Sequence, residues 1–224
     1  MSHLHIPDGV LPWTLWAPAW LVALLLLGAA AIAGRHASAQ QVAYRGTLGA
    51  LVLAAMTLAV PLGPVEYHLG LIGVLGALLG PAAAFEALFV VSAILAFAGH
   101  GGLTVVGLNA LVLGAGAAVA RPVHSACVRA FGPARALAAA AAAAQAVSGA
   151  MWVAIMLATL RHGPGPFGRS AALPWVTGVA VVVWLAGVAV ETLVALGIGR
   201  FLARVKPELL PGTDARAFAG GIAA

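Results

Sequence analysis

The sequence has few charged residues and only one cysteine. Asp, Glu, Lys and Arg make up 8% of the 224 residues, whereas aliphatic and aromatic residues make up 63%. Soluble domains are about a quarter charged, so this chain has too little polar surface to cover a water-soluble globule, and lipid is the solvent that fits it. The single Cys127, which falls between two hydrophobic runs, excludes an intrachain disulfide and a cysteine-based metal cluster.

Several short motifs are also absent from the chain. There is no G-x-x-x-x-G-K-[ST] sequence, which excludes ATP hydrolysis by that route, and no H-E-x-x-H sequence of the zinc hydrolases. The Lys and Arg residues form no stripe with interleaved aromatic residues, so nucleic acid is not an expected partner. No basic segment precedes the first hydrophobic run, so we expect that run to be a membrane span and not a cleavable signal peptide.

Seven hydrophobic runs follow one another along the chain, at 11–34, 44–62, 69–80, 82–98, 103–120, 136–160 and 173–198. They predict an all-α integral membrane protein with about seven transmembrane helices. The third run is the shortest: at ~1.5 Å per residue it reaches only ~18 Å, against a hydrocarbon core of ~30 Å. It either begins earlier, near Val65, or forms a short helix buried among the others. The glycine-rich segment 99–102 predicts a tight turn.

The basic residues predict the orientation of these helices. With the N-terminus outside, only Arg161 and Arg169 are external, and the remaining basic residues are cytoplasmic: Arg35, Arg45, Arg121, Arg129, Arg135, Arg200, Arg204, Lys206 and Arg216. Cytoplasmic loops carry an excess of Lys and Arg. The pattern therefore predicts an external N-terminus and a cytoplasmic C-terminus.

In that topology four histidines lie on the external side. His3 and His5 precede the first run, His68 follows the second and His100 follows the fourth. Imidazole is the usual nitrogen ligand of nickel, cobalt, copper and zinc. Spacing alone leaves two possibilities open, a shared metal site or separate solvated side chains.

The N-terminus itself can supply nitrogen ligands. A free amine followed closely by His can chelate a metal through the amine, an ionised backbone amide and an imidazole, a donor set that suits square-planar nickel(II) or copper(II). If Met1 is removed, Ser2 carries the amine and His3 is the second residue, which gives three nitrogens. If Met1 stays, His3 is third and four nitrogens are possible. The alternative is a disordered chain end.

Two glutamates, Glu86 and Glu191, fall inside hydrophobic runs. A charged side chain at the centre of a membrane helix costs ~2.5–3.5 kcal/mol on insertion scales. We therefore expect each to have a partner or to stay protonated, and to act in structure or coupling and not as a metal ligand.

Four segments, in order along the chain, carry a resemblance to a known family. They are His-Ile-Pro-Asp-Gly-Val-Leu-Pro at 5–12, Pro-Val-Glu-Tyr-His-Leu-Gly at 64–70 leading into Leu-Leu-Gly-Pro at 78–81, Gly-His-Gly-Gly-Leu-Thr at 99–104 with Asn109, and the stretch from Glu191 to Phe-Leu-Ala-Arg-Val-Lys-Pro-Glu-Leu-Leu at 201–210. The chain resembles the substrate-specific membrane component of energy-coupling-factor cobalt/nickel transporters.

The resemblance implies a metal site with a defined set of ligands. The N-terminal segment would fold back into an external cavity, and the metal would be held by the terminal amine, a His just after it and His68. In the usual pattern the initiator Met directly precedes the signature His, whereas here Ser2, His3 and one further residue stand before His5. We rank the Ser2 amine paired with His3 slightly above a site built on His5.

Four further residues are expected to shape the site: Asp8, His100, Thr104 and Asn109. Asp8 either orients a ligand His or caps a turn with Gly9. Residues 1–210 would form a single transmembrane metal-binding domain, and 211–224 a short mobile tail.

The function implied is substrate capture in an energy-coupling-factor type ABC importer for cobalt(II) or nickel(II), in a bacterial or archaeal inner membrane. The implied partners are a transmembrane coupling protein, two cytoplasmic ATPases, in some cases a small accessory membrane protein, and membrane lipid. No organic cofactor is expected. The alternative is a membrane-embedded zinc hydrolase, which needs an open coordination position and a general base. The sequence does not separate cobalt from nickel.

Overall fold

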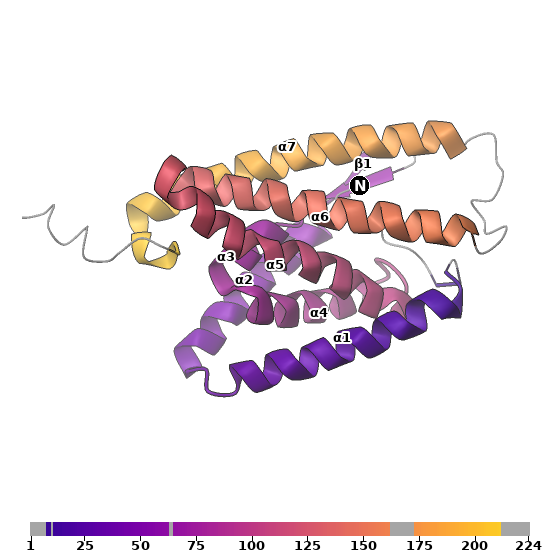
Figure 1. Cartoon of the computed structure of the whole chain (residues 1–224), viewed down its shortest axis with the longest axis horizontal. Coiled ribbons are helices and arrows are strands. Elements are labelled where there is room, and N and C mark those ends of the chain that lie inside the picture. Colours follow the sequence, from indigo (N-terminus) through magenta and orange to yellow (C-terminus); the bar gives the residue numbers. More distant parts are fainter. Residues whose placement is uncertain (1–7, 10, 63–64, 162–172, 212–224) are drawn as a thin grey trace, which may run out of the picture.

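The structure, a computed structural model, describes residues 8–9, 11–62, 65–161 and 173–211. Seven α-helices, a two-stranded hairpin and two short 3-10 helices make up this part of the chain (Figure 1). In order they are α1 Trp13–Gly34, α2 Ala39–Thr57, β1 Ala59–Leu62, β2 Val65–His68, α3 Ile72–Leu79, α4 Pro81–Phe97, η1 Leu103–Val105, α5 Val106–Phe131, α6 Pro133–Arg161, α7 Leu173–Val205 and η2 Pro207–Leu209.

Length and composition alone make four stretches of helix suitable for crossing a membrane: Trp13–Gly34, Leu103–Phe131, Pro133–Ile155 and Val181–Val205. Pro81–Phe97 is a shorter apolar helix. The predicted class, an all-α membrane protein with about seven helices, is confirmed, while the orientation of the termini stays a prediction.

The helices form a bundle with α5 inside it. In Figure 1, α1 and α7 lie at opposite edges, with α4, α5 and α6 between them. Helix α5 packs against α1, α3, α4 and α6. By contrast, α1 is apolar and mostly exposed, with Leu21, Leu25 and Ile32 among its uncovered side chains. An apolar helix face with no protein partner fits lipid as its neighbour.

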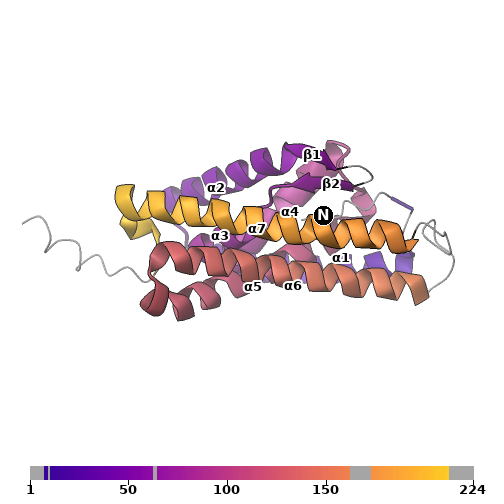
Figure 2. The same ribbon diagram turned by 90° about the horizontal axis from the view of Figure 1, so that it is seen from above.

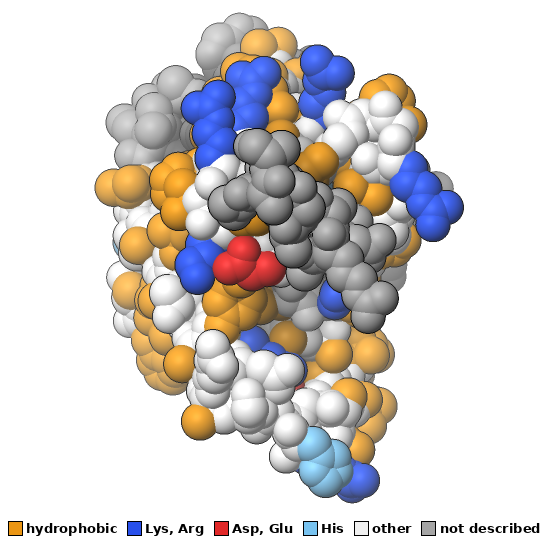
Figure 3. All heavy atoms as spheres, turned by 90° about the vertical axis from the view of Figure 1, so that its left-hand side faces the viewer, with side chains coloured by type: hydrophobic (Ala, Val, Ile, Leu, Met, Phe, Trp, Pro, Cys, Tyr) orange, Lys and Arg blue, Asp and Glu red, His pale blue; other side chains and the backbone are white. Residues whose placement is uncertain are grey.

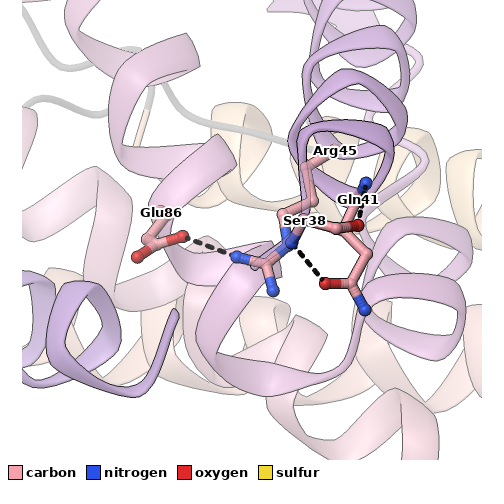
Figure 4. Close-up of polar contacts among 4 residues, drawn as sticks. All are labelled: Ser38, Gln41, Arg45 and Glu86. Carbon is pink, nitrogen blue, oxygen red and sulfur yellow. Dashed lines mark hydrogen bonds and ion pairs between the residues drawn. The ribbon is translucent and has the colours of Figure 1, made fainter. Parts of the chain in front are cut away.

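The second run predicted one helix over 44–62, and this prediction was wrong at both ends. Helix α2 begins earlier, because the Ser38 hydroxyl accepts a hydrogen bond from Gln41 N at 3.2 Å while Gln41 Oε1 accepts one from Ser38 N at 2.9 Å (Figure 4). This reciprocal capping box starts a helix. The helix ends at Thr57, and 59–62 pair antiparallel with 65–68, with Ala59 opposite His68. Pro61 explains the change, because proline disfavours a helical residue before it and lacks a backbone donor.

Helix α3 corresponds to the third run, 69–80, and confirms the second alternative for it, a short helix buried among the others. Its eight residues span ~12 Å, and Ile72 through Ala77 are buried. Two glycines on it allow close approach to its neighbours: a Cβ at Gly76 would lie 2.7 Å from Ala117 Cα of α5, and one at Gly73 would lie 2.9 Å from Ala140 O of α6. Small residues at such contacts are typical of helices packed in lipid.

Helix α5 continues to Phe131, past its predicted end at 120, so Cys127 is helical and does not lie in a loop. The α1–α2 corner, the α5–α6 corner and the end of α7 lie together at one end of the bundle (Figure 1). These segments carry the described residues predicted to be cytoplasmic: Arg35, Arg45, Arg121, Arg129, Arg135, Arg200, Arg204 and Lys206. Figure 3 shows Lys and Arg side chains gathered over this end, which we call the basic end.

Candidate functional site

His68, at the end of β2, is the predicted metal ligand that the structure describes best. Its side chain is 1% exposed, and Nδ1 lies 2.8 Å from the carbonyl oxygen of Met56 in α2. A carbonyl oxygen only accepts hydrogen bonds, so Nδ1 is the donor in this contact. A histidine that donates one N–H to a backbone carbonyl and presents the other nitrogen is the usual arrangement of a metal-binding imidazole.

The fold brings His100 to His68. The two ring centroids lie 6.2 Å apart with an interplanar angle of 86°. His100 lies in the turn after α4, where Gly99 and Gly101 have φ values of 85° and 100°, a region that favours glycine. Its backbone N–H donates to Leu95 O at 2.8 Å, which closes the turn on the end of α4. Two of the loops predicted to be external therefore meet, which was one of the two possibilities that the spacing left open.

Asp8 ties the N-terminal segment to this same turn. Its carboxylate accepts hydrogen bonds from Leu103 N at 3.1 Å, Thr104 N at 2.8 Å and Thr104 Oγ1 at 2.6 Å. The first N–H groups of a helix have no partner within it and favour a negative charge, so Asp8 caps η1 from a distant segment. The Thr104 hydroxyl bond, with the two backbone bonds, holds the pKa of the Asp8 carboxyl below its ordinary value of 3.8.

The Asp8 contact is one that neither expectation for this residue included. The side chain caps a helix start ninety-five residues away, at Leu103. A Cβ at Gly102 would overlap Asp8, so glycine is needed there for the two segments to touch. Nothing in the sequence signals such a pairing, because the residues that form it are far apart along the chain.

The turn is fixed from a third side by α1. Trp20 Nε1 donates a hydrogen bond to Thr104 O at 2.7 Å, and Trp20 packs against Gly107 at the start of α5. Asn109, two residues further along α5, is 8% exposed, and its Oδ1 has no hydrogen-bond partner among the described residues. Thr104 thus serves the turn's geometry, while a role of Asn109 near the metal stays a prediction.

Ser2, His3 and His5 lie outside the described residues. Among the residues that the structure describes, no group of three His, Cys, Asp or Glu side chains could hold a metal ion. His68 and His100 are therefore the part of the proposed nitrogen cluster that the coordinates show. Within this part no carboxylate joins the two imidazoles, so a general base for a hydrolase is not found beside them.

Both intramembrane glutamates have the partners that were expected. Glu86 Oε2 on α4 lies 3.6 Å from Arg45 Nη1 on α2, at the basic end (Figure 4). Glu191 on α7 is 1% exposed and accepts hydrogen bonds from Gly70 N and Leu71 N, just after His68. The sequence predicted a partner for Glu191 but gave no sign that the partner is the backbone next to a candidate ligand.

The comparisons with known proteins decide the family. Residues 5–209 match the CbiM family, described as the cobalt uptake substrate-specific transmembrane region. This chain belongs to that family. The match begins at His5 and includes Asp8, His68, His100 and Thr104, so every described part of the candidate site falls inside it.

Two solved structures share the fold of this family member. A crystal structure of a truncated transition metal transporter has a TM-score of 0.66 and 20% sequence identity, and covers 90% of this chain and 99% of that chain. A crystal structure of a transition metal transporter has a TM-score of 0.63 and 20% identity, with 90% and 93% covered. No curated protein matches the chain. Family and fold together make this a multi-pass membrane component of metal transport.

Proposed function

We propose that this protein is the substrate-capture subunit of an energy-coupling-factor type ABC importer for cobalt(II) or nickel(II) in a bacterial or archaeal inner membrane. The observation that carries the proposal is His68. Burial, the bond of Nδ1 to Met56 O and the nearby ring of His100 give an imidazole whose orientation is fixed, as a metal ligand requires. Membership of the cobalt uptake family over 5–209 supports the same conclusion.

The remaining ligands would come from the N-terminus. Asp8 is bonded to Leu103 and Thr104, close in sequence to His100. His5 stands three residues before Asp8 in the sequence, and Ser2 six residues before it. We propose that the Asp8 contact directs the N-terminal nitrogen donors toward the His68–His100 pair. We propose His68, the free amine and His3 or His5 as the ligand set.

Nitrogen donors suit the proposed substrates. An amine, an ionised amide and imidazoles favour nickel(II) in planar geometry, and cobalt(II) accepts the same donors. Protons compete for each of these nitrogens, so binding should weaken as the pH falls through the usual imidazole range. Capture at neutral pH and weakened binding in acid are therefore both expected.

The energy for uptake would come from other subunits. The chain has no Walker A sequence, so ATP hydrolysis must be supplied by partners. We propose a transmembrane coupling protein and two cytoplasmic ATPases, with a small accessory membrane protein in some assemblies. The basic end, which carries Arg129, Arg200 and Arg204 on α5 and α7, is proposed as the cytoplasmic end on which the coupling protein docks.

Radiolabelled metal uptake tests this function. Cells that express the chain together with a coupling protein and two ATPases should accumulate nickel or cobalt, and an ATPase-dead partner should stop accumulation. His68→Ala should abolish uptake, whereas His36→Ala, which removes an imidazole exposed at the α1–α2 corner, should not. Uptake that persists without ATPase activity or in His68→Ala, or hydrolysis of a substrate by the pure protein, would contradict the proposal.

A further inference from the structure

Glu191 is a buried carboxylate that accepts hydrogen bonds from backbone amides. It lies on α7 at 1% exposure, and its two oxygens accept hydrogen bonds from consecutive amides, Gly70 N and, at 2.9 Å, Leu71 N. The side chain of Gln145, buried on α6, lies next to the same carboxylate. An apolar residue would pack α7 against this bundle without the cost of burying a carboxylate. The carboxylate is therefore suited to a specific task on the 69–71 turn.

The turn that Glu191 holds has an unfavourable backbone. Leu71 has a φ of 51°, the only positive φ of a non-glycine residue in the part of the chain described. The left-handed region is disfavoured for a leucine and persists only where neighbouring groups hold the backbone in it. Glu191 can hold it, because its carboxylate accepts hydrogen bonds from both backbone N–H groups, and such charge-assisted bonds are strong. These two bonds anchor the chain between β2 and α3 to α7.

His68 lies directly before this turn. The imidazole is fixed at one ring nitrogen by Met56 O, and the backbone behind it is fixed by Glu191. Strand β2 also packs against both α2 and α7, and Figure 2 shows the hairpin beside α7. A small rotation of the 69–71 turn would therefore move the His68 ring relative to His100.

We propose that Glu191 is a positioning residue for the metal site. By holding the left-handed turn at Leu71, it fixes the direction of the His68 ring, although it touches no metal itself. This inference rests on the proposed function, since it assigns Glu191 a role in the same site. A purely structural role, in which Glu191 only attaches α7 to the bundle, leads to different measurements.

The variant Glu191→Gln separates the two roles. Glutamine keeps the shape and one acceptor oxygen, but its amide N–H₂ opposes the second backbone N–H. The purified full-length protein in detergent is titrated with nickel(II) and cobalt(II), and the absorption spectrum of the bound ion and the metal-induced rise in Tm are recorded. The matched control is Thr192→Val, because the Thr192 hydroxyl bonds only Val188 O of its own helix at 2.6 Å.

Loss of an outer residue that orients a metal ligand typically weakens metal binding about 10–100-fold. We expect a loss of this size in Glu191→Gln, a changed spectrum of the bound ion and a smaller metal-induced rise in Tm, with Thr192→Val unchanged. Glu191→Asp, which keeps the charge but shortens the reach, should lie between the wild type and Glu191→Gln. If Glu191→Gln does not fold, Glu191→Asp answers the same question.

Two results would overturn the inference. Folded Glu191→Gln that binds metal within twofold of the wild type, with the same spectrum, shows that Glu191 does not position His68; if Glu191→Gln does not fold, the same result in Glu191→Asp shows it. A lower Tm in both the metal-free and metal-bound forms, by the same amount, assigns it to structure alone. If the wild type itself binds neither nickel nor cobalt tightly, the proposed function has failed, which is a separate outcome from a failure of the inference.

Discussion

Individual side chains in this site act mainly by fixing one another. The Met56 carbonyl orients the His68 ring, and the Asp8 carboxylate selects the position of the N-terminal segment. Neither group is proposed to touch the metal. A site of this kind depends on residues beside the ligands, as metal sites generally do.

Removing the Asp8 carboxylate should release the N-terminal segment from η1. Asp8→Ala loses three hydrogen bonds, to Leu103 N, Thr104 N and Thr104 Oγ1. We expect faster proteolysis before Leu11 and weaker nickel binding, by about 10-fold or more. Glu208→Gln is the matched control, because Glu208 is an exposed carboxylate at the basic end whose pKa is also lowered, mainly by its own backbone N–H and then by Lys206. Equal affinity in Asp8→Ala and the wild type would refute the tether.

The lowered pKa of Asp8 gives this tether a pH window. The folded-state pKa lies below the ordinary 3.8, so the contribution to stability is present above pH 3.8 and is lost as the pH falls through the lower, folded value. Loss of metal binding at higher pH, in the usual imidazole range, must then come from protonation of the nitrogen ligands. Proteolysis before Leu11 should accordingly stay slow at pH 5, where metal binding has already weakened.

At the scale of helices and strands, most of the structure could be predicted from the sequence. Hydrophobic runs identify helices because a segment that crosses lipid must hydrogen-bond its own backbone N–H and C=O groups, and a helix does so. The hairpin at 59–68 was missed, because its first strand continues the apolar run of α2 without a polar break. The link from Glu191 to Gly70 was also missed, since it joins residues 121 positions apart that no local pattern connects.

The predicted topology puts the loops of His68 and His100 on one side of the membrane, but it left open whether the two side chains meet, which the structure shows they do. The hydrogen bond of His68 Nδ1 to Met56 O could not be predicted. The Met56 carbonyl lacks a partner within its own helix only because α2 ends at Thr57, earlier than the sequence indicated. The order of the N-terminal ligands, Ser2 with His3 or His5, stays a prediction.

Helix α3 depends on its glycines for its buried place. A methyl group at Gly76 would lie 2.7 Å from Ala117 Cα, and α5 offers no side chain there that could move aside. Gly76→Ala should lower the free energy of unfolding by about 1–3 kcal/mol, the usual cost of overpacking. Thermal unfolding in detergent measures it. Gly28→Ala on α1, where no atom lies within 4 Å of the new Cβ, should unfold like the wild type. Similar Tm values for the two variants would contradict the close α3–α5 packing.

At the scale of the whole molecule, the charges divide the bundle into two ends. The basic end carries the α1–α2 and α5–α6 corners and the end of α7. Asp8 instead precedes the start of α1, His68 contacts Met56 in the last turn of α2, and His100 follows the end of α4. The excess of Lys and Arg on cytoplasmic loops makes the basic end the expected cytoplasmic face. Metal capture and ATPase docking would then occur on opposite sides of the membrane.

This orientation can be measured with reporter fusions. A reporter fused after Ala224 should be active only as a cytoplasmic fusion, and one inserted between α6 and α7, after Arg161, only as an external one. Substituting Arg129, Arg200 and Arg204 by Gln should reduce the fraction of molecules inserted with the C-terminus in the cytoplasm, because basic residues determine the orientation. An external signal from the fusion at Ala224 would contradict the seven-helix topology.

The central claim is that the chain captures metal with His68 and its own N-terminal amine. The most direct test is a nickel(II) titration of the purified protein with a free amine, compared with the same protein acetylated at that amine and with His68→Ala. Acetylation removes the amine as a ligand and leaves every side chain unchanged, so a site made of side chains alone would not respond. We expect tight one-to-one binding by the free form and loss of high-affinity binding in both altered forms, with helical content unchanged. Equal affinity of the acetylated and free forms would contradict the claim.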